Sequence, residues 1–99
     1  MATLNITLRV EELRDRSALP EQELMAIIEH GIIEPRDAQA NVWEFEPQMA
    51  EVAARAARLH RDLDIDWQGV ALALDLLQEI EELKRENHRL KVRLSRLES

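Results

Sequence analysis

Cysteine is absent from this chain of 99 residues, and glycine occurs only twice. Without cysteine there is no disulfide framework, no thiolate metal site and no cysteine nucleophile. Two glycines leave little room for a glycine-rich phosphate loop, and the sequence contains no nucleophile elbow or metal-ligand constellation. We therefore predict a non-enzymatic protein that uses no cofactor and no metal. Only three residues are aromatic, so the core must consist mainly of leucine, isoleucine, valine and alanine.

Long apolar runs are also missing. No stretch approaches the ~18–20 apolar residues of a membrane-spanning helix, and no cationic segment followed by an apolar one opens the chain. We therefore expect a cytoplasmic protein without membrane contact. Acidic residues exceed basic ones, and the formal net charge is −7. Such a charge disfavours non-specific association with nucleic acid and favours a basic partner.

Residues 67–99 are predicted to form one long helix with a heptad repeat. Large apolar residues recur at alternating spacings of four and three, and one isolated helix cannot bury such a seam. We predict that the seam pairs with a second copy of the chain to form a homodimer. The a and d positions of this dimerisation seam are Ala73, Leu76, Ile80, Leu83, Asn87, Leu90, Leu94 and Leu97.

The charges beside the dimerisation seam favour a parallel pair. In a parallel dimer each g residue faces the e residue of the following heptad on the other chain. All three such pairs are attractive: Glu79 with Lys84, Glu86 with Lys91, and Arg93 with Glu98. A single asparagine at an a position also favours two strands in register. An antiparallel pair, or a helix whose leucine face packs on its own domain, is the alternative.

The first 31 residues predict a strand and two short helices. Alternating apolar and polar residues indicate a strand whose buried face is formed by Leu4, Ile6, Leu8 and Val10. Residues 10–16 are predicted to form one or two helical turns, and Pro20 fits the first position of a second helix. Gly31 should end that helix as a left-handed residue. Two short helices joined by a tight turn form a helix-turn-helix.

A loop over residues 32–41 is followed by a predicted strand over residues 42–45, which pairs with the first strand or forms the outer limb of a wing. Pro47 should start a third helix, whose apolar positions follow the helical period: Met49, Val52, Ala53, Ala56, Leu59 and Leu63. A turn over residues 62–66 leads to the final helix, for which Asp66 is a good N-cap.

The opening of the final helix is apolar nearly all round, so it must be covered on more than one side. We expect Val70, Leu74 and Leu77 to close the core of a domain that spans residues 1–66. Trp43 and Trp67 are expected in the core, with an interface anchor as the alternative. The predicted fold class is therefore mainly α with a small β wing.

This order of elements resembles the winged helix-turn-helix of MerR-type proteins. The stretches that resemble that family are residues 10–13 (VEEL), residues 28–36 (IEHGIIEPR), and the strand at residues 43–45 followed by Pro47. The likeness covers roughly residues 4–75. It implies a MerR-like winged helix-turn-helix followed by a long C-terminal coiled-coil helix.

Within that group the chain resembles the chaperone-modulator family CbpM over almost its whole length. The matching stretches are residues 33–36 (IEPR), 43–45 (WEF), 66–71 (DWQGVA), 83–87 (LKREN) and 93–97 (RLSRL). This resemblance implies binding to the J-domain of CbpA, a nucleoid-associated relative of the co-chaperone DnaJ. It also implies inhibition of that protein's stimulation of DnaK and of its attachment to DNA.

Charge distinguishes this interpretation from its alternative, a dimeric MerR-type transcription regulator. Regulators of that type insert their second helix into the major groove and have Arg and Lys on it and on the wing. Here the second helix has glutamates and no Lys or Arg, and residues 33–42 contain one basic residue, Arg36. Because phosphate contacts provide most non-specific affinity, such a surface repels DNA. We therefore predict no direct binding of nucleic acid.

Small and acidic residues on a helix face suit a basic protein helix, and J-domains have a basic second helix beside their His-Pro-Asp motif. We expect the exposed face of the second helix and the following loop to bind that helix. The predicted partner-binding residues are Glu23, Ala26, Glu29, His30, Glu34 and Arg36. A merely solvated helix face is the alternative.

Overall fold

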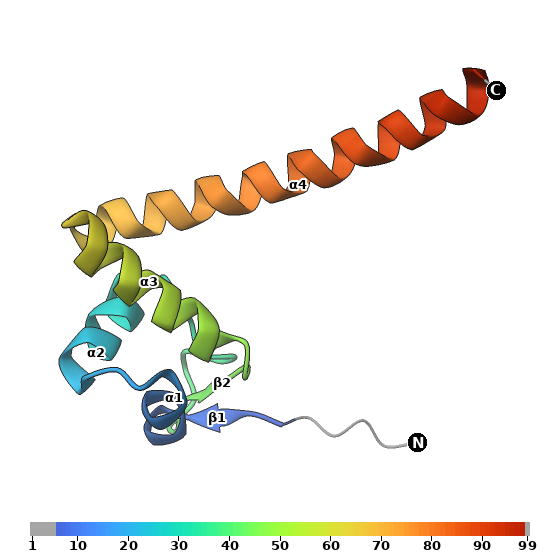
Figure 1. Ribbon diagram of the computed structural model, residues 1–99. Coiled ribbons are helices and arrows are strands. Elements are labelled where there is room, and N and C mark those ends of the chain that lie inside the picture. The colour runs from blue at the N-terminus through green and yellow to red at the C-terminus, as the bar shows by residue number, and fades with distance from the viewer. Residues whose placement is uncertain (1–5, 99) are drawn as a thin grey trace, which may run out of the picture.

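The computed structural model describes residues 6–98 and is mainly helical (Figure 1). Its elements are β1 (Leu8–Arg9), α1 (Val10–Ser17), α2 (Glu21–Glu29), β2 (Glu44–Phe45), α3 (Met49–Leu63) and α4 (Trp67–Glu98). The first five elements form a compact body, and α4 crosses the end of α3 and extends far beyond that body (Figure 1). The predicted fold class is confirmed.

The small sheet is antiparallel, with Leu8 opposite Phe45 and Arg9 opposite Glu44. Pairing of the two predicted strands is thus confirmed, but each strand has only two residues. Leu8 is buried as predicted, whereas the side chain of Ile6 is 64% exposed and Val10 already belongs to α1. The alternating pattern predicted a longer strand than the one observed, because β2 ends at Phe45 and has no residue opposite Ile6. Leu4 lies outside the described residues.

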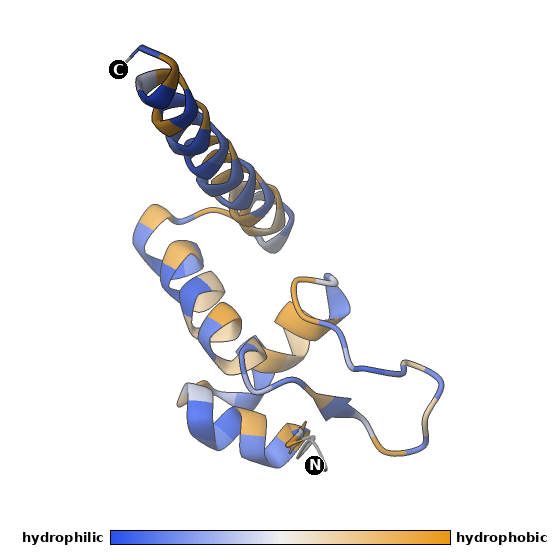
Figure 2. Cartoon of the chain, turned by 90° about the vertical axis from the view of Figure 1, so that its right-hand side faces the viewer, coloured by the Kyte–Doolittle hydropathy of each residue, from blue (hydrophilic) through white to orange (hydrophobic). Residues whose placement is uncertain are grey.

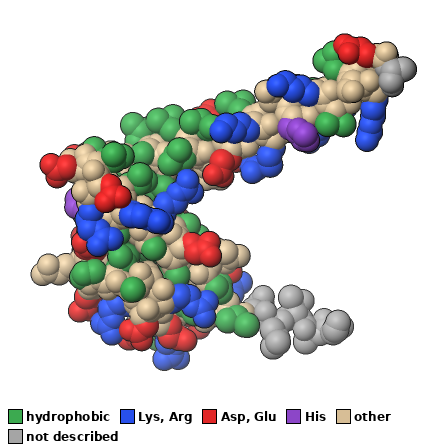
Figure 3. All heavy atoms as spheres, viewed as in Figure 1, with side chains coloured by type: hydrophobic (Ala, Val, Ile, Leu, Met, Phe, Trp, Pro, Cys, Tyr) green, Lys and Arg blue, Asp and Glu red, His purple; other side chains and the backbone are tan. Residues whose placement is uncertain are grey.

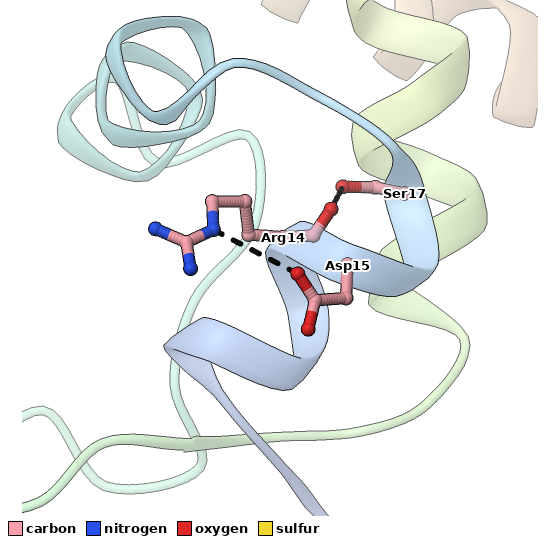
Figure 4. Close-up of polar contacts among 3 residues, drawn as sticks. All are labelled: Arg14, Asp15 and Ser17. Atoms are coloured by element: carbon pink, nitrogen blue, oxygen red, sulfur yellow. Dashed lines mark hydrogen bonds and ion pairs between the residues drawn. The ribbon is translucent and has the colours of Figure 1, made fainter.

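The turn between α1 and α2 completes the helix-turn-helix. Ala18 ends α1 in the left-handed conformation, with φ of 58°, and its N–H donates to the carbonyl oxygen of Arg14 at 2.9 Å. The buried Ser17 hydroxyl donates to the same oxygen at 3.2 Å, as Figure 4 shows. Pro20 is the N-cap of α2, one residue before the predicted position, because α2 begins at Glu21.

Gly31 ends α2 as predicted, with φ of +69°. The N–H of Gly31 donates to the carbonyl of Ile28 at 3.0 Å, and the N–H of Ile32 donates to that of Ile27 at 3.1 Å. This pair of bonds is a Schellman motif, which requires a left-handed residue at its centre and satisfies the last carbonyls of the helix. The motif turns the chain sharply from α2 into the loop over residues 32–43.

The core lies where α1 and α2 pack on α3, with the small sheet beside α1 and the base of α4 against α3. Its buried hydrophobic residues are Leu8, Leu13, Leu19, Leu24, Ile27, Ile28, Ile33, Phe45, Ala50, Ala53, Ala56, Ala57 and Val70.

The predicted apolar face of α3 is confirmed except at Leu63, which is 59% exposed. Leu63 is the last residue of α3, where the chain turns into α4. The helix also begins at Met49 and not at Pro47, which accepts a turn hydrogen bond from Ala50.

The connection between α3 and α4 is a tight elbow over residues 64–66, shorter than the predicted turn. Asp64 ends α3 with φ of 52°, and Asp66 caps α4 by accepting a hydrogen bond from the N–H of Gly69 at 2.8 Å. The His60 ring stacks on Trp67 with centroids 3.9 Å apart, and its Nδ1 lies 2.7 Å from the carbonyl oxygen of Ile65. These contacts define the direction in which α4 leaves the body.

Only the base of α4 packs on the body. Val70 is buried, and Leu74 packs against the core, as predicted, while Leu77 is half-buried. Both tryptophans are half-buried and pack against the core, which favours the core interpretation of their role. Every described residue of α4 from Gln78 onward is exposed. The second half of the helix therefore has no covering surface within the described chain.

Candidate partner-binding surface

Four predicted partner-binding residues lie on α2 or at its C-cap, and they differ in exposure. Glu29 and His30 are exposed, whereas Glu23 and Ala26 are half-buried. The Oε2 atom of Glu23 is fully buried and has no hydrogen-bond partner within the described part of the chain. The prediction of an open helix face was therefore wrong at Glu23 and Ala26, because that side of α2 turns partly toward the body. The accessible end of the face is at Glu29 and His30.

His30 is held against the end of α2 by two contacts to Ala26. Its backbone N–H donates to the Ala26 carbonyl oxygen at 3.0 Å, and its ring Nδ1 lies 2.9 Å from the same oxygen. Since a carbonyl oxygen can only accept, this contact places a proton on Nδ1. The Nε2 atom of the neutral ring is then a hydrogen-bond acceptor on an exposed side chain.

The other two predicted residues lie in the loop that follows. Arg36 is anchored twice: its backbone N–H donates to the Glu44 carbonyl at 2.8 Å, and its Nε lies 3.1 Å from Glu46 Oε1. Glu34 lies beside Gly31, with its Oε1 atom 3.8 Å from the point where a Cβ on that glycine would lie. Arg36, the only arginine among the predicted partner-binding residues, is thus already paired with a carboxylate. Its charge is balanced by that of Glu46, so the remaining charge of these residues is acidic.

Two hollows meet at residues Gly31 and Ile32. The first, which we call the α4 crevice, has a volume of about 250 Å³ and is lined by His30, Gly31, Ile32, Val52, Ala71, Leu74, Asp75 and Gln78. The second, the loop hollow, has a volume of about 550 Å³ and is lined by Gly31, Ile32, Ile33, Glu34, Arg36, Glu46 and Met49. Together they form one hollowed surface from the loop to the base of α4.

Four lining residues of the α4 crevice come from α4, and none was predicted as a binding residue: Ala71, Leu74, Asp75 and Gln78. The sequence does contain a signal for them. Asp75 and Gln78 are polar residues three apart in an otherwise apolar stretch, so they share one side of the helix. Their neighbours on α2 and the loop are distant in sequence, so only the folded chain shows that they adjoin the predicted surface.

The dimerisation seam lies open along α4. Its large apolar members are all exposed, with these exposed fractions: Leu76 (50%), Ile80 (46%), Leu83 (62%), Leu90 (47%), Leu94 (55%) and Leu97 (84%). Figure 3 shows hydrophobic side chains along the edge of α4 that faces away from the body, and Figure 2 shows apolar segments recurring along the helix. Leu72, a g position outside the predicted seam, is also 61% exposed. Ala73 is half-buried.

Six of the chain's 13 basic residues lie in the second half of α4, and the others lie on the body, where Figure 3 also shows blue side chains. Arg89 pairs with Glu86 within the helix, and Arg55 of α3 lies 4.0 Å from Glu81. The second half of α4, residues 83–98, is thus the basic part of this helix, with six basic residues against two acidic ones. Across residues 6–98, no helix has the length and apolar character needed to cross a bilayer.

A structure of this kind, with a helix-turn-helix, a small sheet and a long C-terminal helix, is that of a MerR-type protein. The family model described as MerR HTH family regulatory protein matches residues 8–92, which is most of the chain.

Curated relatives define the family more narrowly. The chaperone modulatory protein CbpM of Pseudomonas putida (strain W619) is 42% identical over 95 residues, which cover 96% of this chain and 94% of the relative. CbpM of Escherichia coli (strain K12 / DH10B) is 41% identical over 96 residues, with 97% and 95% covered. The chain belongs to the CbpM family, and its general role is that of a chaperone modulator.

Proposed function

We propose that this protein binds the J-domain of a DnaJ-like co-chaperone, CbpA, and inhibits both its co-chaperone activity and its DNA binding. Membership of the CbpM family supports a role as a chaperone modulator. The observation that supports this particular partner is a set of exposed carboxylates: Glu34 lines the loop hollow, Asp75 lines the α4 crevice, and Glu29 is exposed at the end of α2. Such a surface is complementary to a cationic protein helix, and complementary charge speeds encounter and selects the partner.

The proposed inhibition follows from competition for the same positive charges. A cationic helix that is covered by carboxylates cannot contact another protein through that face. Its lysine and arginine side chains are also no longer free to neutralise phosphates, on which DNA affinity depends. One bound modulator thereby blocks both activities of the co-chaperone.

We propose further that two copies pair through the dimerisation seam of α4. The support is the row of large apolar side chains along this seam, all at least 46% exposed. Exposed leucines at heptad spacing on a helix that extends from the body are typical of a coiled-coil surface. The pairing places one J-domain surface on each copy, because the seam and the two hollows are formed by different residues.

A titration with the isolated J-domain tests the proposed partner. We expect the double variant Glu29→Lys/Glu34→Lys to bind about tenfold or more weakly than the unchanged protein, because like charges would then meet across the interface. The matched control is Glu11→Lys/Asp15→Lys, which makes the same charge change on exposed positions of α1 and should retain affinity within about twofold. Equal binding by both double variants would exclude the α2 and loop surface.

DNA regulation is the second candidate, favoured by the helix-turn-helix and by the MerR family model. The α2 helix that would enter the groove contains Glu21, Glu23 and Glu29 and no lysine or arginine. A mobility shift of duplex DNA at physiological salt, together with no response to the J-domain, would favour this second candidate and contradict the first.

A further inference from the structure

The α4 crevice has the size and chemistry of a pocket for a side chain. Its volume of about 250 Å³ lies below the roughly 300–1,000 Å³ typical of small-molecule sites. Its larger apolar residues, Ile32, Val52 and Leu74, are half-buried, as is Ala71, so their exposed parts form an open apolar floor. Binding energy in protein interfaces is concentrated where a large apolar side chain enters a pocket of this kind.

The rim of the crevice is polar and acidic. Asp75 lies at the α4 side, and His30 lies opposite on the end of α2, where Nδ1 is bound to Ala26 and Nε2 can accept a hydrogen bond. No lysine or arginine lines the crevice. Glu34 adds a further carboxylate beside Gly31, the residue that the crevice shares with the loop hollow. The electrostatic complement of this rim is a cation next to an apolar group.

We propose that the α4 crevice is the anchor pocket for the co-chaperone: it takes a large apolar side chain of the J-domain's basic helix, while Asp75 pairs with a neighbouring lysine or arginine. This inference rests on the proposed function and adds to it the base of α4 as part of the docking surface. Amphipathic helices bind hydrophobic grooves through their apolar face, and a helix with cations beside its apolar anchor also matches the acidic rim of this crevice.

The crevice and the dimerisation seam use different sides of α4. Ala71, Asp75 and Gln78 follow one another at spacings of four and three and therefore form a single stripe. The exposed seam leucines, beginning with Leu76, form another stripe. Both surfaces can therefore be occupied at once, and substitutions in the crevice should leave the oligomeric state unchanged.

Two substitutions test the pocket in independent ways by calorimetric titration with the isolated J-domain. Ala71→Trp fills the crevice, and Asp75→Lys reverses the charge of its rim. We expect each to weaken binding about tenfold or more. The loss for Asp75→Lys should shrink as salt is raised from 50 to 500 mM, because salt screens exposed charges, whereas the loss for Ala71→Trp should persist.

Two matched controls test whether the loss of binding is specific to the α4 crevice. Ala54→Trp makes the same enlargement at a half-buried position of α3 that lines a different hollow, beside Arg16 and Pro47. Asp15→Lys makes the same charge reversal on α1, where Asp15 is 81% exposed. Both controls should bind within about twofold of the unchanged protein. Circular dichroism confirms that each variant is folded, and Asp75→Lys, at an exposed helix position, provides the decisive comparison if Ala71→Trp unfolds.

The outcomes separate the inference from the proposed function. If the unchanged protein does not bind the J-domain, the proposed function fails, and the inference fails with it. If the unchanged protein binds and Asp75→Lys binds within twofold of it, the anchor pocket is overturned while the proposed function stands. A change in the homodimer mass of either crevice variant, measured by light scattering, would show that a second copy occupies the crevice and would also overturn the inference.

Discussion

Single residues at the ends of helices determine where this chain turns. Gly31 provides the positive φ of a Schellman motif, and Asp64 adopts φ of 52° to end α3. Asp66 then caps α4 through the N–H of Gly69. These positions were largely readable from sequence, because Gly after a helix and Asp before one have local causes. The left-handed conformation of Asp64 could not be predicted from the sequence. In a residue other than glycine, this conformation depends on the direction that the tertiary structure imposes on the chain.

Loss of the cap on α4 should lower the stability of the protein. We expect Asp66→Ala to reduce the free energy of unfolding by about 1 kcal/mol, because the N–H of Gly69 loses its acceptor. The measurement is urea denaturation followed by circular dichroism. Asp62→Ala is the control, since Asp62 is exposed on the last turn of α3 and forms no cap. An equal loss of stability in both variants would contradict a capping role for Asp66.

Packing against α3 determines the shape of the body. Four alanines on this helix, Ala50, Ala53, Ala56 and Ala57, are at most 4% exposed. Small side chains on α3 let α1 and α2 approach closely, and the period of 3.6 residues made this buried face predictable. The strands were less predictable. The sheet pairs only two residues of each strand, so most of the alternating segment has no neighbouring strand. Ile6 is therefore exposed, although the alternating pattern predicted its burial.

Enlarging one buried alanine should disturb this packing. We expect Ala56→Leu to lower the free energy of unfolding by about 1–3 kcal/mol, because a fully buried site of close contact has no room for three more carbons. Ala54→Leu, at a half-buried position on the same helix, should cost much less. Thermal melts of the two variants compare the sites under one condition, and equal melting temperatures would refute tight packing at Ala56.

The whole molecule presents two separate surfaces, an acidic hollowed one on the body and an apolar one along α4. The α2 and loop part of the first surface was predictable from the run of acidic residues. Its α4 part was not, because Ala71, Asp75 and Gln78 become binding candidates only when α4 folds back beside Gly31 and Ile32. The predicted pairing through the seam remains a prediction, for which the exposure of its leucines provides support.

Introducing charge into the seam should separate the proposed homodimer. We expect Leu83→Glu/Leu90→Glu to be monomeric by light scattering, because pairing would bury four unpaired carboxylates. The control His88→Glu/Ser95→Glu places the same groups at exposed b positions of the same helix, with the same spacing of seven residues, and should stay dimeric. Affinity for the J-domain should be retained in both, since neither double variant alters a hollow. A monomeric unchanged protein would contradict the pairing.

The sequence by itself determined the helix order, the caps at Gly31 and Asp66, the leucine seam and the anionic character of α2, because each depends on residues close together in the chain. Only the tertiary structure decided which side of α2 is accessible, where the strands end and which part of α4 joins the binding surface. Those features depend on contacts between residues distant in sequence. Such contacts form only when burial of the core positions α3 and the elbow at Asp64 directs α4 across the body.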